Sequence, residues 1–434
     1  MGKPIKILLL TNRDSQNVGD LIIEGTDVSL IKLVFQNLGY APDEISINSR
    51  AGGIIPKEWV DGKSQALGDA EDVIKNSDIV IFGGAPILNY KYQFFYIRTI
   101  KVIEICEKYN KSVLFSAIGV EEYDDTAKEC QMLKKALNKP IVKMITTRDD
   151  IDSVKKYIDN PDTIIGKVAD PAVWTDKIYG KMAERQKKCI GLLPVRIAIF
   201  KDNKLRWNEK KQMHFWKNVI DRLKKDGYTY KLFTSGHFTD EYFLMDFANK
   251  YNIPKENYNL SVHVPEQLVE EINKCDGLIS FRMHPSIIAY SYGIPSIGLA
   301  WNFKVQKFYE AVNYDNRSIP KEKWDAEYVT EELYKAMNEG VKKEEEFLMT
   351  IYDSLYNTIK SLYPSKKEIA FNSNHFPQFE PTTINRYGEI LNNKTKRIMI
   401  DRGRFIVRSL RKIERFFKEI VSFIKNVKKE LRRR

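Results

Sequence analysis

Short apolar runs that alternate with longer helix-like segments are the feature that most constrains how this chain can fold. The first runs cover residues 5–10, 78–82, 112–118 and 143–147, and residues 21–38 form the first helix-like segment. Each run has the length of one buried strand, and strands separated by helices are typical of a parallel, doubly wound sheet. The sequence therefore predicts an α/β domain at the N-terminal end.

The same alternation starts again after Lys188, which predicts a second α/β domain. Its predicted elements are strands at residues 189–193, 230–234 and 277–280 and helices around residues 216–223 and 327–362. A hydrophilic stretch, residues 176–188, separates the two series and is the predicted linker. The predicted organisation is an N-terminal domain (1–180), a C-terminal domain (181–365), a connector (366–394) and a helical tail (395–434).

The length and composition of the chain are those of a globular protein. The chain has 434 residues, of which 43% are hydrophobic, enough for two cores and an appendage. Its four cysteines are scattered without a CxxC pair, so we expect neither a zinc site nor a disulfide scaffold, and we infer no metal or cofactor. The first apolar run is too short for a signal peptide, and no run approaches the roughly 18 apolar residues of a membrane span. We therefore expect a cytoplasmic protein.

Two polar loops follow predicted strands of the N-terminal domain. The first contains Asn17, Gly19 and Asp20 and leads into a helix, whose N-terminal amides can bind anions and polar ligands. A purely structural alternative is that Asp20 caps this helix and Gly19 shapes the turn. The second loop contains Gly83 and Gly84 but no GxGxxG pattern, so it does not predict a dinucleotide site.

Three cationic or titratable side chains follow predicted strands of the C-terminal domain. Arg282 and His284 come directly after the strand at residues 277–280, and Lys304 follows the next strand. Each could have an ordinary role, in a surface ion pair, as a helix cap or in solvent. Because the carboxyl ends of parallel strands meet at one edge of a sheet, we expect the three to converge. An arginine fork, a lysine charge and a histidine proton donor suit a small, strongly anionic substrate.

The order and spacing of these motifs resemble the polysaccharide pyruvyl transferase family over roughly residues 5–310. The shared motifs are Asn17-Val18-Gly19-Asp20, Gly83-Gly84, Thr147-Arg148-Asp149 with Ser153, Val168-Ala169-Asp170-Pro171, and Arg282-Met283-His284 followed by Gly293-Ile294-Pro295 and Lys304. The glycine loop continues as Ala85-Pro86 and not as a longer glycine run, and the tail after Lys394 lies outside the shared region.

The resemblance implies two Rossmann-like domains in a glycosyltransferase-B-like arrangement. It implies transfer of the pyruvyl group of phosphoenolpyruvate to a sugar of a polysaccharide or of a lipid-linked precursor, with the donor bound by the C-terminal domain. On this basis the donor-binding residues are Arg196, Arg282, Met283 and Lys304. The expected acceptor-facing residues are Asn17, Gly83 and Gly84.

The chemistry of ketal formation assigns further roles. Phosphoenolpyruvate must be protonated on its methylene carbon, and we expect His284 to be the general acid and Asp20 a base. Arg148 and Asp149 are interpreted as a structural pair at a helix start, and Asp170 as similar support near the domain junction. His214 and His237 are candidates of low rank.

Two other function classes compete with this interpretation. A nucleotide-sugar-dependent glycosyltransferase would share the architecture, but residues 285–292 contain no acid to hold a nucleotide ribose. An inactive, membrane-associated glycan-binding protein is the non-enzymatic alternative, and the joint presence of Arg, His and Lys argues against it.

The formal net charge of +12 lies mostly in the tail. Residues 395–434 contain 15 Lys and Arg against 4 Asp and Glu. Apolar residues recur at helical spacing there, at Ile406, Leu410, Ile413, Phe417, Ile420, Ile424, Val427 and Leu431. A broad apolar stripe bordered by bases favours binding of Arg402–Arg434 to an anionic membrane surface, which would make the protein peripheral at the inner face of the cell membrane. Self-association as a homo-oligomer through a coiled coil is the alternative, and nucleic-acid binding is not expected.

Overall fold

The computed structural model describes residues 3–13, 15, 17–90 and 95–378. The predicted basic helix and most of the predicted connector lie outside the described residues. Among those that are described, no helix combines the length and the apolar character that a membrane crossing requires.

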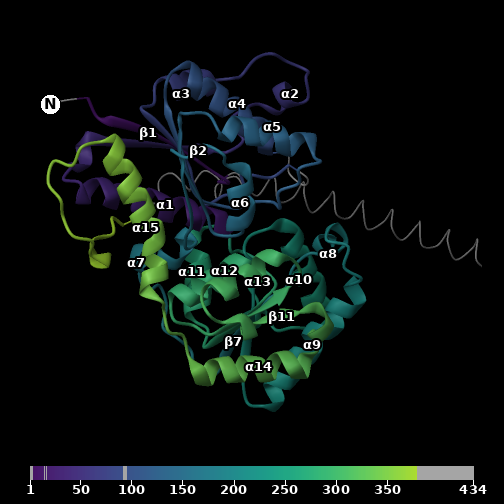
Figure 1. Ribbon diagram of the computed structural model, residues 1–434. Helices are drawn as coiled ribbons and strands as arrows, with labels where there is room; N and C mark the ends of the chain where they lie inside the picture. Colours follow the sequence, from purple (N-terminus) through teal and green to yellow (C-terminus); the bar gives the residue numbers. More distant parts are fainter. Residues whose placement is uncertain (1–2, 14, 16, 91–94, 379–434) are drawn as a thin grey trace, which may run out of the picture. The chain divides into compact units, whose positions relative to one another are not determined.

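The N-terminal half, from β1 to α7, is built on a sheet of six parallel strands in the order β2-β1-β3-β4-β5-β6 (Figure 1). Its strands are β1 (Ile5–Thr11), β2 (Ile45–Ala51), β3 (Ile79–Phe82), β4 (Ser112–Ile118), β5 (Val142–Thr147) and β6 (Ile164–Lys167). Its helices are α1 (Val18–Asn37), α2 (Lys57–Val60), α3 (Ala70–Lys75), α4 (Phe95–Lys108), α5 (Lys128–Leu137), α6 (Ile151–Tyr157) and α7 (Thr175–Tyr179).

Strand β1 shows why apolar runs form the centre of this sheet. Ile7 and Leu9 belong to the core cluster on the α1 side, whereas Leu8 and Leu10 belong to the cluster that includes α4 and α5. Successive strand residues point to opposite faces, so a strand covered by helices on both sides must be apolar throughout.

The C-terminal half, from β7 to α14, contains five parallel strands in the order β11-β10-β9-β7-β8. Its strands are β7 (Cys189–Leu193), β8 (Thr229–Leu232), β9 (Gly277–Ser280), β10 (Ser296–Ala300) and β11 (Ser318–Pro320). Its helices are α8 (Ala198–Asp202), α9 (Glu209–Lys225), α10 (Phe238–Tyr251), α11 (Pro265–Asn273), α12 (Met283–Ser291), α13 (Phe303–Ala311) and α14 (Ala326–Glu339).

The predicted fold class, two Rossmann-like parallel sheets with flanking helices, is confirmed. Two local predictions differ from the structure. The helix expected over residues 327–362 is divided into α14 and α15 (Glu345–Leu362), because Gly340 ends α14 with a φ of 74°. The short strands β2, β6 and β11 were not predicted. They lie at or near sheet edges, where polar or very short sequences can form strands.

Helix α15 packs against the N-terminal half although it follows the C-terminal sheet in the chain (Figure 1). The buried Asn37 Nδ2 donates to the Tyr352 hydroxyl at 2.7 Å, and the Ala169 N–H donates to Thr350 Oγ1 at 3.0 Å. Residues of α1, α12 and α15 belong to one core cluster. This shared core fixes α12 against α1. Helix α12 begins directly after Arg282, one of the predicted site residues.

Each sheet changes its winding direction at one point, between β1 and β3 and between β7 and β9. In parallel α/β sheets, ligands bind beyond the carboxyl ends of strands at such points. The loops after β1, β3, β7 and β9 are therefore the place to look for a site.

The Asn37–Tyr352 hydrogen bond gives a test of the α15 contact. Tyr352→Phe leaves the buried Asn37 amide without its acceptor, and we expect the free energy of unfolding in urea to fall by about 1–3 kcal/mol. The control is Tyr356→Phe on the same helix, since the Tyr356 hydroxyl forms no hydrogen bond with the described residues. Equal losses in the two variants would contradict the assigned contact.

Candidate active site

A cavity of about 610 Å³ opens where loops from both sheets meet. Its N-terminal wall comes from the loops after β1, β2, β3 and β5 and from the start of α4, with Thr11, Asn12, Ser15, Asn17, Asp20, Ala51, Gly52, Gly53, Pro86, Phe95, Arg98 and Arg148. Its C-terminal wall comes from the loops after β7, β8, β9 and β10, with Arg196, His237, Arg282, Met283, His284, Trp301, Asn302 and Lys304. The predicted convergence of Arg282, His284 and Lys304 is therefore present, and Arg196 joins them.

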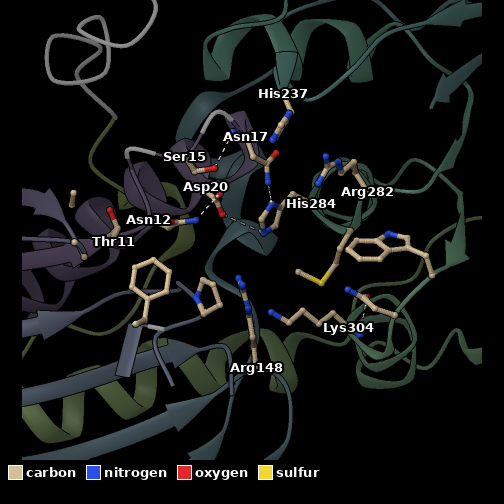
Figure 2. A pocket seen from close by; sticks show the side chains of 18 of the residues that line it. Thr11, Asn12, Ser15, Asn17, Asp20, Arg148, His237, Arg282, His284 and Lys304 are labelled. Carbon is tan, nitrogen blue, oxygen red and sulfur yellow. Dashed lines mark hydrogen bonds and ion pairs between the residues drawn. The ribbon is translucent and has the colours of Figure 1, made fainter. Parts of the chain in front are cut away.

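Asn17 and His284 connect the two walls (Figure 2). Asn17 is the N-cap of α1, so the cap is not Asp20, and Asn17 Oδ1 accepts the Gly19 N–H at 3.3 Å. This leaves Asn17 Nδ2 to donate to His284 Nδ1, 2.9 Å away. A neutral His284 with an accepting Nδ1 carries its proton on Nε2.

Close contact with α1 fixes the imidazole of His284. His284 lies in the first turn of α12. A Cβ added to Gly19 would lie 2.4 Å from both Cβ and Nδ1 of His284, so only glycine permits this approach. The position of Gly19 therefore reflects packing between the halves more than turn geometry.

The surroundings of His284 disfavour its protonated form. Burial lowers the pKa of His284 well below its usual range, and the positive charges of Arg148, Lys304 and Arg282 lower it further. Nε2 lies 4.0 Å from Asp20 Oδ1, and no described residue forms a hydrogen bond with it. Without a bound anion, His284 is thus neutral at physiological pH.

Asp20 faces His284 from the first turn of α1 (Figure 2). Its Oδ2 accepts from Asn12 Nδ2 at 3.1 Å. Burial raises the pKa of Asp20, although hydrogen bonds from Ser15 and Asn12 and the charges of Arg148 and Arg282 oppose the shift. A carboxyl group with a raised pKa can exchange a proton nearer to neutral pH.

Asp240, which was not predicted, orders the two arginines of the C-terminal wall. Its side chain is fully buried in the first turn of α10, and its Oδ2 accepts from Nε and Nη2 of Arg282 at 2.9 and 2.6 Å. Its Oδ1 accepts the backbone N–H of Arg196 at 3.0 Å. Nothing in the sequence distinguishes Asp240 from an ordinary acid at a helix N-terminus, so only the fold reveals its role.

Lys304 and Met283 also line the C-terminal wall. Lys304 lies in the first turn of α13, whose N-cap Asn302 accepts the Lys304 N–H at 3.2 Å. Burial lowers the pKa of the Lys304 amino group, as does Arg148, while Asp149 raises it.

Arg148 lies in the cavity wall opposite Lys304, which corrects the interpretation of Arg148 and Asp149 as a structural pair. Its Nη1 donates to Asp170 Oδ2, 22 residues further along the chain, and both side chains are buried. In Figure 2 the Arg148 side chain extends toward Asp20 and His284, and the amino end of Lys304 lies beside it. Asp170 thus supports a residue of the cavity.

The family profile described as polysaccharide pyruvyl transferase matches residues 5–302. The chain belongs to the polysaccharide pyruvyl transferase family. No curated protein matches the sequence.

Solved structures share the fold of this pyruvyl transferase family member. UDP-GlcNAc 2-epimerase from Methanocaldococcus jannaschii is 13% identical with a TM-score of 0.50, covering 83% of this chain and 99% of the epimerase. Another UDP-N-acetylglucosamine 2-epimerase is 12% identical with a TM-score of 0.50, covering 86% and 100%. At such identities the likeness shows the fold alone, a glycosyltransferase-B-like pair of domains.

Two residues of the family motifs lie away from the cavity lining. A Cβ on Gly83 would lie 2.2 Å from Asp27 Oδ2, and one on Gly84 would lie 2.5 Å from Ile23 Cγ2. Both glycines let the loop after β3 approach α1. Contact of Gly83 and Gly84 with the acceptor stays a prediction. Pro86, in the same loop, lines the cavity.

Of the two low-ranked histidines, one reaches the cavity. His237 is the N-cap of α10, and burial lowers its pKa to about 4, with smaller effects of Arg196 and Arg282. His214 is exposed on α9. The described part of the chain holds no cluster of three His, Cys, Asp or Glu side chains suited to a metal ion.

The packing role of Gly84 can be tested. Gly84→Ala introduces a methyl group against Ile23 and Pro171, and we expect a loss of about 1–3 kcal/mol in the free energy of unfolding in urea. Gly166→Ala in β6 is the control, because its Cβ would meet Thr146 at an ordinary 3.8 Å. If Gly84→Ala has the stability of the wild type and only its use of the sugar is impaired, the acceptor role is favoured over the packing role.

Proposed function

We propose that this protein transfers the pyruvyl group of phosphoenolpyruvate to two hydroxyls of a sugar in a polysaccharide or lipid-linked precursor, forming a ketal. The observation that carries the proposal is a cavity in which Arg196, Arg282 and Lys304 accompany a buried histidine that faces a carboxyl group. Membership of the pyruvyl transferase family supports the same reaction class.

Donor binding follows from the charges of the C-terminal wall. Phosphoenolpyruvate carries a carboxylate and a phosphate, and Arg196, Arg282 and Lys304 would neutralise both. Asp240 holds Arg282 in place, so little conformational freedom is lost when an anion binds. Met283 would contact the donor beside Arg282.

Protonation of the donor carbon is assigned to His284 Nε2. The anionic donor offsets the positive charges that lower the pKa of His284, so binding favours the imidazolium form, which can donate a proton from Nε2. In that form Nδ1 also carries a proton, and the Asn17 amide would turn its oxygen toward Nδ1 to accept it. Asp20, 4.0 Å from Nε2, would then accept a proton from the attacking hydroxyl.

The proposed reaction balances without a cofactor. His284 protonates the methylene carbon, the first sugar hydroxyl bonds to the neighbouring carbon, and its proton passes to Asp20. The carbon–phosphate ester bond breaks, the second hydroxyl closes the ring, and its proton leaves with inorganic phosphate. The proton on Asp20 then passes to His284 and returns it to its acid form. Over one complete cycle, the new methyl group therefore gains one proton, which a sugar hydroxyl replaces.

The acceptor would occupy the N-terminal wall. Asn12, Ser15 and Asn17 present polar groups there, and Asn17 would act through its hydrogen bond to His284. Hydroxyl and amide groups of this kind suit the hydroxyls of a saccharide.

A nucleotide sugar is the alternative donor. Isothermal titration with phosphoenolpyruvate and, separately, with a UDP-sugar distinguishes the two, and we expect heat of binding only from the former. Tight binding of the UDP-sugar alone would favour a glycosyltransferase.

His284→Gln provides the catalytic test. The glutamine keeps a polar side chain at this position but cannot act as a proton donor near neutral pH, so we expect phosphate release in the presence of acceptor to fall by about 10²-fold or more. The exposed His214→Gln is the matched control and should retain the wild-type rate. Wild-type phosphate release by His284→Gln would remove His284 from the mechanism.

The membrane association proposed for Arg402–Arg434 rests on its sequence pattern. A basic amphipathic helix on an anionic inner leaflet would hold the protein at the membrane that carries a lipid-linked acceptor, and each basic residue near the surface would contribute about 1 kcal/mol.

Removal of residues 402–434 tests this localisation. The shortened chain should no longer sediment with vesicles that contain anionic lipid, while its turnover of a soluble acceptor should stay near that of the full chain. Vesicles of neutral lipid serve as the control. Undiminished sedimentation after truncation would refute the membrane role, and a change in molecular mass by light scattering would favour self-association.

A further inference from the structure

Arg148 is a charged group of the cavity for which the proposed roles do not account. It follows β5 and belongs to the N-terminal wall, whereas the other proposed donor-binding residues belong to the C-terminal wall. Its guanidinium extends toward Asp20 and His284, and the Lys304 amino group lies beside the Arg148 side chain (Figure 2). The charge of Arg148 lowers the pKa of both Lys304 and His284. Two like charges that line one cavity repel each other, so an anion bound between them stabilises both.

Asp170 fixes the direction of the Arg148 side chain. Its Oδ2 accepts from Arg148 Nη1, and its Oδ1 accepts the Ala172 N–H at 2.9 Å at the start of the short 3-10 helix Pro171–Trp174. Only 5% of each side chain in the pair is exposed. The carboxylate is thereby held at both oxygens, and it restricts Arg148 to one orientation.

The guanidinium of Arg148 keeps donor groups for a ligand. One nitrogen, Nη1, donates to Asp170, and the described residues form no hydrogen bond with Nη2. Arginine presents five N–H groups in a rigid fork, which suits phosphate and carboxylate oxygens.

The two walls therefore present similar pairs. Asp240 holds Arg282 on the C-terminal wall, and Asp170 holds Arg148 on the N-terminal wall. Both arginines lower the pKa of His284, as expected of charges near the same imidazole. We propose that Arg148, oriented by Asp170, binds one anionic group of the donor together with Lys304, while Arg196 and Arg282 bind the other.

This inference rests on the proposed function, because the donor it concerns is phosphoenolpyruvate. It adds that the donor is bound from both walls, with Arg148 as a binding residue and Asp170 as a positioning residue. The donor would thus bridge the halves of the protein at the point where His284 and Asp20 face each other.

The test replaces the whole pair, because removing one partner would leave a buried, unpaired charge that could prevent folding. In Arg148→Gln/Asp170→Asn both charges are lost and a neutral hydrogen bond can form. We expect the Kd for phosphoenolpyruvate, measured by titration calorimetry on the full chain, to rise at least about tenfold, or about 1.4 kcal/mol. The matched control is Arg222→Gln/Asp226→Asn, which removes a 2.7 Å ion pair between α9 and its C-cap, outside the cavity lining, and should leave the Kd unchanged.

A second readout separates ligand binding from general structural support. His284 faces Asn17 and Asp20 as well as the cations Arg148, Arg282 and Lys304. Loss of the Arg148 charge should therefore raise the pKa of His284 in the ligand-free double variant, as followed by NMR of the imidazole. The Arg222/Asp226 control should not change it.

The outcomes are distinct. If the wild-type protein does not bind phosphoenolpyruvate, the proposed function fails. If it binds, and the folded double variant binds equally well, the role of Arg148 is overturned while the function stands. Should the double variant not fold, Arg148→Lys decides, because one ammonium cannot reproduce the fork, and an unchanged Kd in that variant would overturn the inference.

Discussion

Positive side chains in a partly enclosed cavity repel one another and lose hydration, so they must be held by fixed negative partners. Asp240 and Asp170 meet this requirement here. Each is buried, accepts a backbone N–H with one oxygen and holds an arginine with the other. The orientation of Arg282 and Arg148, and the electrostatic potential at His284, depend on these two carboxylates.

The same electrostatic potential controls the protonation state of His284. Burial and three neighbouring cations keep it neutral, and the hydrogen bond from Asn17 directs its proton to Nε2, on the side of Asp20. An acid that becomes protonated mainly when an anion is bound would protonate a donor without remaining charged in the empty site. The glycine at position 19 is necessary for this arrangement, because any side chain there would displace the imidazole.

The sequence predicts the parts of the fold and site that depend on local patterns. Strands β4, β7 and β9 are contiguous apolar runs and were predicted with the observed bounds, whereas the polar edge strand β2 has no such run. Likewise, residues that follow strands could be expected to converge, because parallel strands place their carboxyl ends together.

The partners of those residues could not be predicted. Asp240 lies in an ordinary first helical turn, and Arg148 finds its carboxylate 22 residues away. Gly84 has the appearance of a ligand-binding loop residue, but the side chains that require it to be glycine belong to Ile23 and Pro171, which only the folded chain brings near. Long-range contacts of this kind leave no periodic signal in the sequence.

Helix α15 has a consequence for how proteins of this architecture can be recombined. The chain passes from the N-terminal to the C-terminal half once, after α7, and returns through α15, whose Tyr352 and Thr350 are bonded to residues of the first half. A chimera with a single crossover would therefore join α15 of one parent to α1 of the other and mismatch a buried interface. An exchange of specificity between relatives needs two crossovers, one between α7 and β7 and one between α14 and α15, so that each half is transferred with the helix that covers it.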